Sequence, residues 1–114
     1  MGRRLVRSGA LSNWSVPGAE RQVRPLASDD EHDELLRRKL IEEATETAFV
    51  QPHRPDGSTM HLKLLDECAD VLEVLRAMLG RHGITIDDLI DRAETRAGKS
   101  GDFGPLALVW DTGR

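Results

Sequence analysis

The chain contains few of the residues that form cross-links or aromatic cores: one cysteine, no tyrosine, two tryptophans and two phenylalanines. A single cysteine, Cys68, excludes an internal disulfide, and its place in an aliphatic run predicts a small buried side chain. Aliphatic residues must therefore fill the core. No segment approaches the roughly 20 apolar residues of a membrane span, and the N-terminus lacks the apolar stretch of a signal peptide. We expect a cytoplasmic protein without a membrane segment.

Basic residues are also in short supply. Sixteen Lys and Arg are set against twenty Asp and Glu, which gives a formal net charge of -4 at pH 7. This balance argues against a nucleic-acid partner, because non-specific binding to nucleic acid needs a basic surface. The length of 114 residues predicts a single domain overall. Within it, residues 1–28 read as an N-terminal arm and residues 29–114 as a helical domain with an apolar C-terminal tail.

Apolar residues at helical spacing predict two long helices. The first should run from about Asp30 to Val50, and Ser28, Asp29 or Asp30 can cap its start. The second should run from about Met60 to Arg81, and Gly83 suits the left-handed conformation beyond its end. The apolar face of the second helix is too broad for the first to cover. A shared four-helix core in a dimer would bury it.

A short third helix and a few extended segments complete the predicted fold. Thr85 as the cap and Asp88 at the third helical position predict a helix that runs to about Ala97. The strand candidates are Arg4–Arg7, Gln22–Leu26 and Leu106–Trp110, of which the last would pair with the N-terminal arm. The expected fold class is mainly all-α, a helical bundle completed by dimerisation, with short extended segments near the termini.

The two long helices carry acidic residues three apart beside their apolar faces. At about 100° per residue, Glu43 and Glu46 lie roughly 60° apart, and Glu67 and Asp70 repeat this spacing on the second helix. A carboxylate against an apolar face is costly unless a cation or hydrogen bonds compensate it. If the helices pack antiparallel, the four acids can converge on Mg²⁺ or Mn²⁺, which prefer oxygen ligands. The alternative is that they are ordinary solvated charges, and by the same geometry Glu73 is directed outward.

The segments around these acids resemble a known family. The stretches "RRLVR", "RRKLIEEATE", "ECADVLEVLRAML" and "HGITIDDLIDRAETRAGKSGDFG" are similar, in this order, to the MazG-like all-α nucleoside triphosphate pyrophosphohydrolases. That superfamily includes phosphoribosyl-ATP pyrophosphohydrolase. Residues 42–46 and 67–70 resemble its EExxE and ExxD patterns. The resemblance implies that the magnesium-binding and catalytic acids are Glu43, Glu46, Glu67 and Asp70, with Glu42 as a supporting acid.

The resemblance further implies Mg²⁺-dependent cleavage of a nucleoside triphosphate between its α and β phosphates. From the shared core we expect a homodimer or homotetramer. A triphosphate carries more charge than the metal cancels, so Lys39, Arg96 and Lys99 are candidate phosphate contacts, with plain surface charge as the alternative. Two other hypotheses stay open. One is the same chemistry on phosphoribosyl-ATP or another specialised biosynthetic nucleotide. The other is a non-enzymatic helical dimer that retained the fold, against which the intact acids argue.

Overall fold

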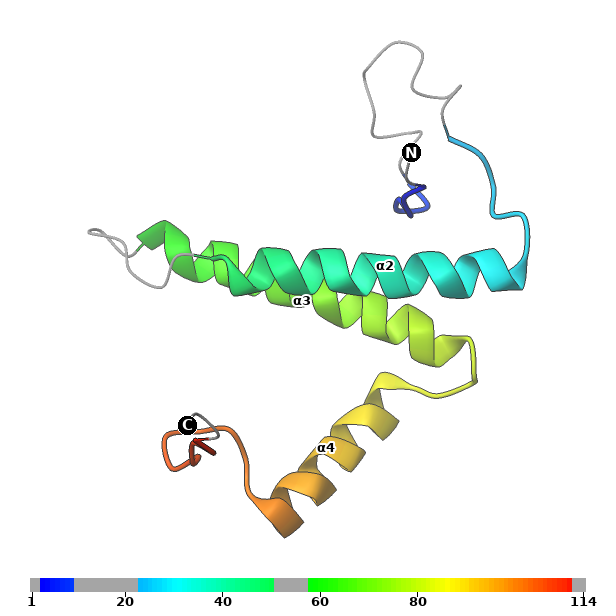
Figure 1. Ribbon diagram of the computed structural model, residues 1–114. Coiled ribbons are helices and arrows are strands. Elements are labelled where there is room, and N and C mark those ends of the chain that lie inside the picture. Colours follow the sequence, from blue (N-terminus) through cyan, green and yellow to red (C-terminus); the bar gives the residue numbers. More distant parts are fainter. Residues whose placement is uncertain (1–2, 10–22, 51–57, 112–114) are drawn as a thin grey trace. The chain divides into compact units, whose positions relative to one another are not determined.

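The computed structural model describes residues 3–9, 23–50 and 58–111, and three helices follow one another in these ranges (Figure 1). They are α2 (Asp29–Ala48), α3 (Ser58–Gly80) and α4 (Ile86–Ser100). No described residue belongs to a β-strand, so the predicted all-α class is confirmed. None of the described helices combines the length and the apolarity that crossing a bilayer would need. The chain divides into two compact units, Met1–Met78 and Leu79–Arg114.

Helix α2 begins at one of its three predicted caps. The Ser28 hydroxyl oxygen accepts a hydrogen bond from the backbone N–H of Glu31 at 3.1 Å, which satisfies one of the free donors at the helix start. Three acids occupy the first turn, where the positive end of the helix dipole favours them. The helix ends at Ala48, two residues before the predicted end.

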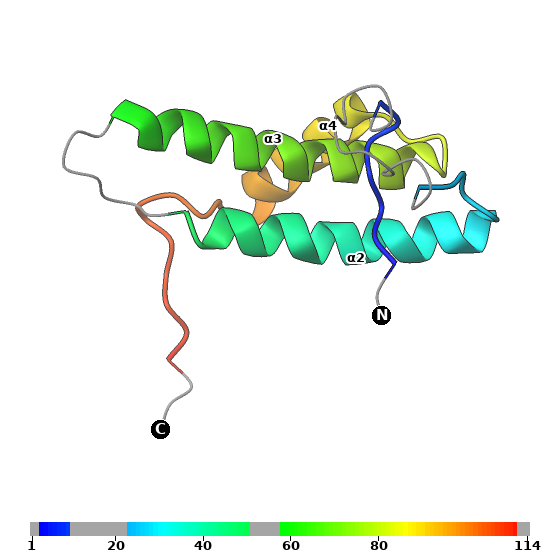
Figure 2. The ribbon, with the colours of Figure 1, turned by 90° about the horizontal axis from the view of Figure 1, so that it is seen from above.

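In the first unit, α2 and α3 lie side by side and run antiparallel (Figures 1 and 2). Among the described residues, the buried apolar side chains are Leu35 and Leu36 of α2 and Val74 of α3. The prediction that Cys68 is buried is wrong, because its side chain is exposed. Glu67 faces α2, so the next residue is turned away from it by about 100°.

The second unit contains the end of α3 and helix α4. Gly83 has a φ of 71°, the left-handed conformation predicted for it. Thr85 caps α4 as expected: its hydroxyl accepts from the Asp88 N–H at 3.1 Å, and the Asp88 carboxylate accepts from the Thr85 N–H at 3.0 Å. Helix α4 continues to Ser100, three residues past the predicted end.

The strand candidates did not become strands. Residues 3–7 and 23–28 have no regular secondary structure, and Gln22 lies outside the described residues. Residues 106–110 also lack a strand, and their large apolar side chains are exposed. A strand needs ladder hydrogen bonds to a partner, whereas the Ala107 N–H donates to the nearby Gly104 carbonyl and closes a tight turn. The division into arm and helical domain stays a prediction.

Candidate active site

Three of the predicted acids come together between α2 and α3. One carboxylate oxygen from each of Glu43, Glu46 and Glu67 lies within 4.8 Å of the other two. Glu43 is buried, Glu67 is half-buried and Glu46 is exposed. The cluster therefore has one open side, from which a ligand in solution can approach it.

Two carboxylate oxygens of this cluster are buried and have no hydrogen-bond partner, Oε2 of Glu43 and Oε2 of Glu67. The other oxygen of each group is neutralised by a lysine on its own helix. Lys39 Nζ lies 3.2 Å from Glu43 Oε1, and Lys63 Nζ lies 3.2 Å from Glu67 Oε1. A buried acceptor without a donor is costly. The two unpartnered oxygens are therefore free to ligate a cation.

Thr47 ties the two helices together beside the cluster. Its hydroxyl oxygen lies 2.8 Å from the Glu43 carbonyl oxygen on α2 and 3.3 Å from the Glu67 carbonyl oxygen on α3. This contact fixes the register of the antiparallel pair at the level of the acids. Because the carbonyls belong to Glu43 and Glu67 themselves, the same register brings their side chains together.

The three carboxylates repel one another. Glu43 raises the pKa of Glu46 through a hydrogen bond and its charge, and Glu67 raises it further. Such repulsion is relieved by a proton shared between the groups or by a cation between them. The donor set consists of oxygens only, which fits a hard divalent ion such as Mg²⁺ or Mn²⁺ better than a metal that prefers nitrogen or sulfur.

The fourth predicted acid, Asp70, lies outside the three-carboxylate group. Its Oδ1 accepts a hydrogen bond from the Arg7 guanidinium at 2.7 Å. Glu42 also lies outside the group and accepts from Lys39 at 2.9 Å and from Arg4 at 3.2 Å. The hydrogen bond from Lys39 is the main reason why the pKa of Glu42 is lowered.

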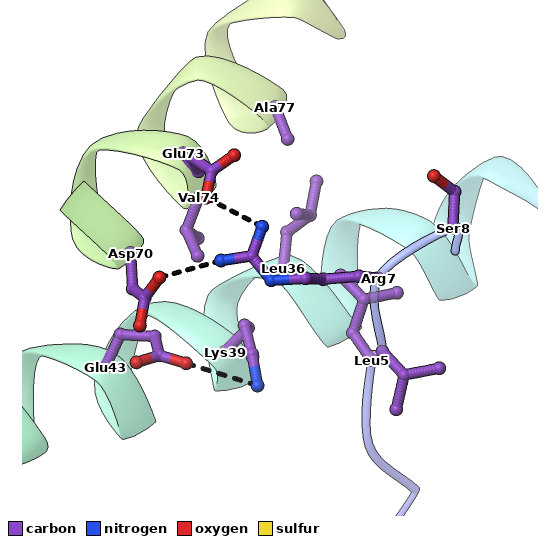
Figure 3. A pocket seen from close by; sticks show the side chains of 11 residues that line it. Leu5, Arg7, Ser8, Leu36, Lys39, Glu43, Asp70, Glu73, Val74 and Ala77 are labelled. Carbon is purple, nitrogen blue, oxygen red and sulfur yellow. Dashed lines mark hydrogen bonds and ion pairs between the residues drawn. The ribbon is translucent and has the colours of Figure 1, made fainter. Parts of the chain in front are cut away.

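A pocket of about 310 Å³ opens beside the cluster, between the N-terminal arm, α2 and α3 (Figure 3). Leu5, Leu36 and Val74 provide its apolar wall. The charged residues that line it are Arg7, Lys39, Glu43, Asp70 and Glu73. Since Glu43 belongs both to the pocket and to the cluster, a molecule in the pocket would lie against the acids.

This geometry agrees with the comparison to protein families. The family described as phosphoribosyl-ATP pyrophosphohydrolase matches residues 18–97, which include all of α2 and α3 and most of α4. The chain belongs to this family. The family lies in the MazG-like all-α nucleoside triphosphate pyrophosphohydrolase superfamily, so the predicted resemblance is confirmed. No curated protein and no solved structure matches the chain.

Membership of the phosphoribosyl-ATP pyrophosphohydrolase family makes the chain a pyrophosphohydrolase, a hydrolase that acts on acid anhydrides. The enzymatic interpretation of the sequence is thereby confirmed. The non-enzymatic alternative loses its support. The roles of the single acids stay predictions, as do the metal and the oligomeric state.

Two charged residues that the sequence did not assign to the site line the pocket, Arg7 and Glu73. The guanidinium of Arg7 lies 2.7 Å from Glu73 Oε1 as well as 2.7 Å from Asp70. These contacts raise the pKa of Arg7, with the hydrogen bond to Glu73 as the largest cause. Glu73 is half exposed, but it points along the pocket and not away from it (Figure 3). The sequence prediction directed Glu73 outward, and its side chain is exposed, but its three-residue spacing from Asp70 also places it beside Arg7.

A buried carboxylate at the start of α2 anchors the arm. Glu31 binds Arg3 and Arg24, which flank the segment 10–22, and it also accepts from the Ala27 N–H at 2.9 Å. The hydrogen bond from Arg24 is the main cause that lowers the pKa of Glu31 to about 2. Glu31 thus fixes the arm to the helix that carries two of the cluster acids.

The other two candidate phosphate contacts, Arg96 and Lys99, lie on α4 in the second unit, and both are exposed. That Arg96 and Lys99 contact phosphate in this pyrophosphohydrolase stays a prediction. Lys39 is different, because its side chain is only 19% exposed and lines the pocket.

Proposed function

We propose that this chain hydrolyses phosphoribosyl-ATP between its α and β phosphates and releases phosphoribosyl-AMP and pyrophosphate, with Mg²⁺ or Mn²⁺ as its metal. The family match supports this substrate over the nucleoside triphosphate that the sequence placed first. The observation that carries the proposal is the pair of buried, unpartnered oxygens on Glu43 and Glu67, next to Glu46 and the pocket.

In this proposal Glu43, Glu46 and Glu67 hold the metal, and Asp70 joins them when substrate is present. A bound divalent ion neutralises phosphate charge and polarises a water for in-line attack on phosphorus. The protein's part is to hold the acids rigidly. Glu43 is fixed by burial and by Lys39, and Thr47 fixes the backbone on both sides of the cluster.

Lys39 is the proposed phosphate contact. Its amine lies 2.9 Å from Glu42 and 3.2 Å from Glu43, so it is held at the boundary between the acids and the pocket. An ammonium group there offsets the negative charge of a phosphate that approaches the carboxylates. Leu5, Leu36 and Val74 form an apolar wall beside these charged groups, against which the non-phosphate part of a substrate can pack.

The test is a pyrophosphate-release assay on the purified protein with phosphoribosyl-ATP, ATP, dATP and the other common nucleoside triphosphates, each with and without MgCl₂. We expect release from phosphoribosyl-ATP that stops when the metal is chelated. Glu67→Gln should lower the rate at least about 100-fold, because it removes a proposed metal ligand. Glu34→Gln is the matched control, since Glu34 is a half-exposed acid of α2 outside the cluster, which binds Arg38 at 2.7 Å and Arg3 at 3.7 Å.

Two results would contradict the proposal. If the triphosphates are cleaved and phosphoribosyl-ATP is not, the first interpretation of the sequence is restored and the proposed substrate is wrong. If no nucleotide is cleaved with either metal, or if Glu67→Gln leaves the rate unchanged, the proposed site is wrong.

We also propose that the chain forms a homodimer through the uncovered faces of its helices. Ile41 of α2 and Leu65 of α3 are 68% and 65% exposed, which is costly for large aliphatic residues that lie close to a core. Size-exclusion chromatography with light scattering should give at least twice the chain mass of 12.7 kDa. A stable monomer would disprove the shared core.

A further inference from the structure

We propose that Arg7 is a latch on the metal site, which holds Asp70 away from the metal until substrate arrives and then exchanges that carboxylate for a substrate phosphate. The inference rests on the proposed function, because it assigns a regulator to the same site. Arg7 lies before residue 18, where the family match begins, so the match gives it no role.

The first step of the argument concerns Asp70. It lies one helical turn after Glu67 on α3, the spacing that puts two side chains on one face. It lines the same pocket as Glu43, and in Figure 3 its carboxylate is turned toward that residue. Asp70 is nevertheless absent from the three-carboxylate group, and its Oδ1 is bound by Arg7 at 2.7 Å. The cation that occupies Asp70 is thus a side chain of the protein.

The second step concerns the form of the contact. Arg7 places one guanidinium nitrogen on Asp70 and another on Glu73, each at 2.7 Å. A guanidinium that bridges two oxygens in this way also matches two oxygens of one phosphate group. When Asp70 leaves, the guanidinium nitrogen that it frees faces the pocket beside Lys39, where a phosphate would otherwise meet a surplus of negative charge.

The third step concerns the support of the latch. Arg3 binds Glu31 and Arg4 binds Glu42, so two neighbouring arginines fix the arm to α2 while Arg7 reaches across to α3. The Arg7 and Asp70 side chains are 64% and 33% exposed, so solvent screens their ion pair. The pair is therefore weak enough to open.

The decisive measurement is metal binding without nucleotide. We would record Mn²⁺ binding by calorimetry or by the electron paramagnetic resonance of free Mn²⁺, on the full chain and on Arg7→Gln. If Arg7 competes for Asp70, its removal should tighten Mn²⁺ binding by about fivefold, the upper range for an exposed ion pair. Arg38→Gln is the matched control. It removes the same charge from an exposed ion pair on α2 without touching Asp70 or the arm, and we expect a change below about twofold.

The second measurement is turnover at saturating metal, where the expected effect has the opposite sign. Arg7→Gln should lower kcat/KM for phosphoribosyl-ATP by about tenfold, because a charged hydrogen bond to phosphate is lost. Arg7→Lys should fall between the wild type and Arg7→Gln in both measurements, since an ammonium keeps the charge but loses the planar fork. Thermal denaturation checks that each variant is folded. If Arg7→Gln does not fold, both measurements are made on Arg7→Lys instead.

The latch is wrong if Arg7→Gln binds Mn²⁺ no more tightly than the wild type, or if Arg38→Gln tightens it equally. A purely structural arginine would weaken both metal binding and turnover. If phosphoribosyl-ATP is not cleaved by the wild type, the proposed function fails, but the Mn²⁺ measurement still decides whether Arg7 competes for Asp70.

Discussion

Replacing Glu43 with Gln should stabilise the metal-free protein and at the same time weaken its stabilisation by metal. Glu43 is a buried acid whose Oε2 has no hydrogen-bond partner and whose carboxylate lies within 4.8 Å of two others. Substitution of a buried side chain that has a structural role normally lowers the stability of the protein. A substitution that raises stability without metal and lowers the stabilisation by metal therefore indicates a ligand site.

The magnitude follows from charge separation. At 4.8 Å, two full charges repel by about 1 kcal/mol in water and about 3.5 kcal/mol at the effective dielectric near a protein surface. The substitution removes such repulsion between Glu43 and Glu67, and the new amide can donate to the free Glu67 oxygen. Loss of the ion pair with Lys39 at 3.2 Å offsets about 1 kcal/mol. We expect a net gain of about 1 kcal/mol, or about 3–6 °C in Tm.

The assay is thermal unfolding followed by circular dichroism, with EDTA and with MgCl₂. A ligand at 100 times its Kd stabilises a folded protein by about 2.7 kcal/mol, so the wild type should gain several degrees with Mg²⁺. Loss of one ligand should weaken binding at least about tenfold, which removes about 1.4 kcal/mol of that gain. Glu34→Gln, an acid outside the cluster, should keep the full response. The reasoning is refuted if Glu43→Gln lowers Tm in EDTA and responds to Mg²⁺ as the wild type does.

Three further predictions concern the supports of the site. The folded pKa of Glu31, about 2, lies below its ordinary value near 4.5, so its stabilising effect is complete above about pH 4.5 and is lost as pH falls toward 2. Urea midpoints of the wild type and Glu31→Gln should therefore converge on acidification, and a constant difference would disprove the role. Thr85→Ala should cost about 1 kcal/mol of unfolding free energy through loss of the α4 cap, measured in urea, whereas Thr85→Ser should cost little. Lys39→Met should raise KM for the nucleotide about tenfold without weakening Mn²⁺ binding, and an unchanged KM would remove Lys39 from the phosphate site.

Much of the fold was predictable because helix signals are local. The caps at Ser28 and Thr85 and the left-handed Gly83 follow from short-range rules, and each is present. The strand predictions at the termini failed, since a strand needs a partner that an apolar run alone does not guarantee. The prediction that Cys68 is buried failed for a related reason. The apolar residues of α3 cover more than one face, and only packing decides which face meets α2.

The sequence by itself determined which acids could act together on each helix. Three-residue spacing fixes the angle between Glu43 and Glu46, and between Glu67 and Asp70, whatever the rest of the chain does. The relation between the helices was left to the tertiary structure. Thr47 sets the register in which Glu67 meets the two acids of α2, and Arg7 reaches Asp70 from 63 residues away in the chain. Spacing within a helix is fixed by backbone geometry, whereas contacts between distant segments depend on how the whole unit packs.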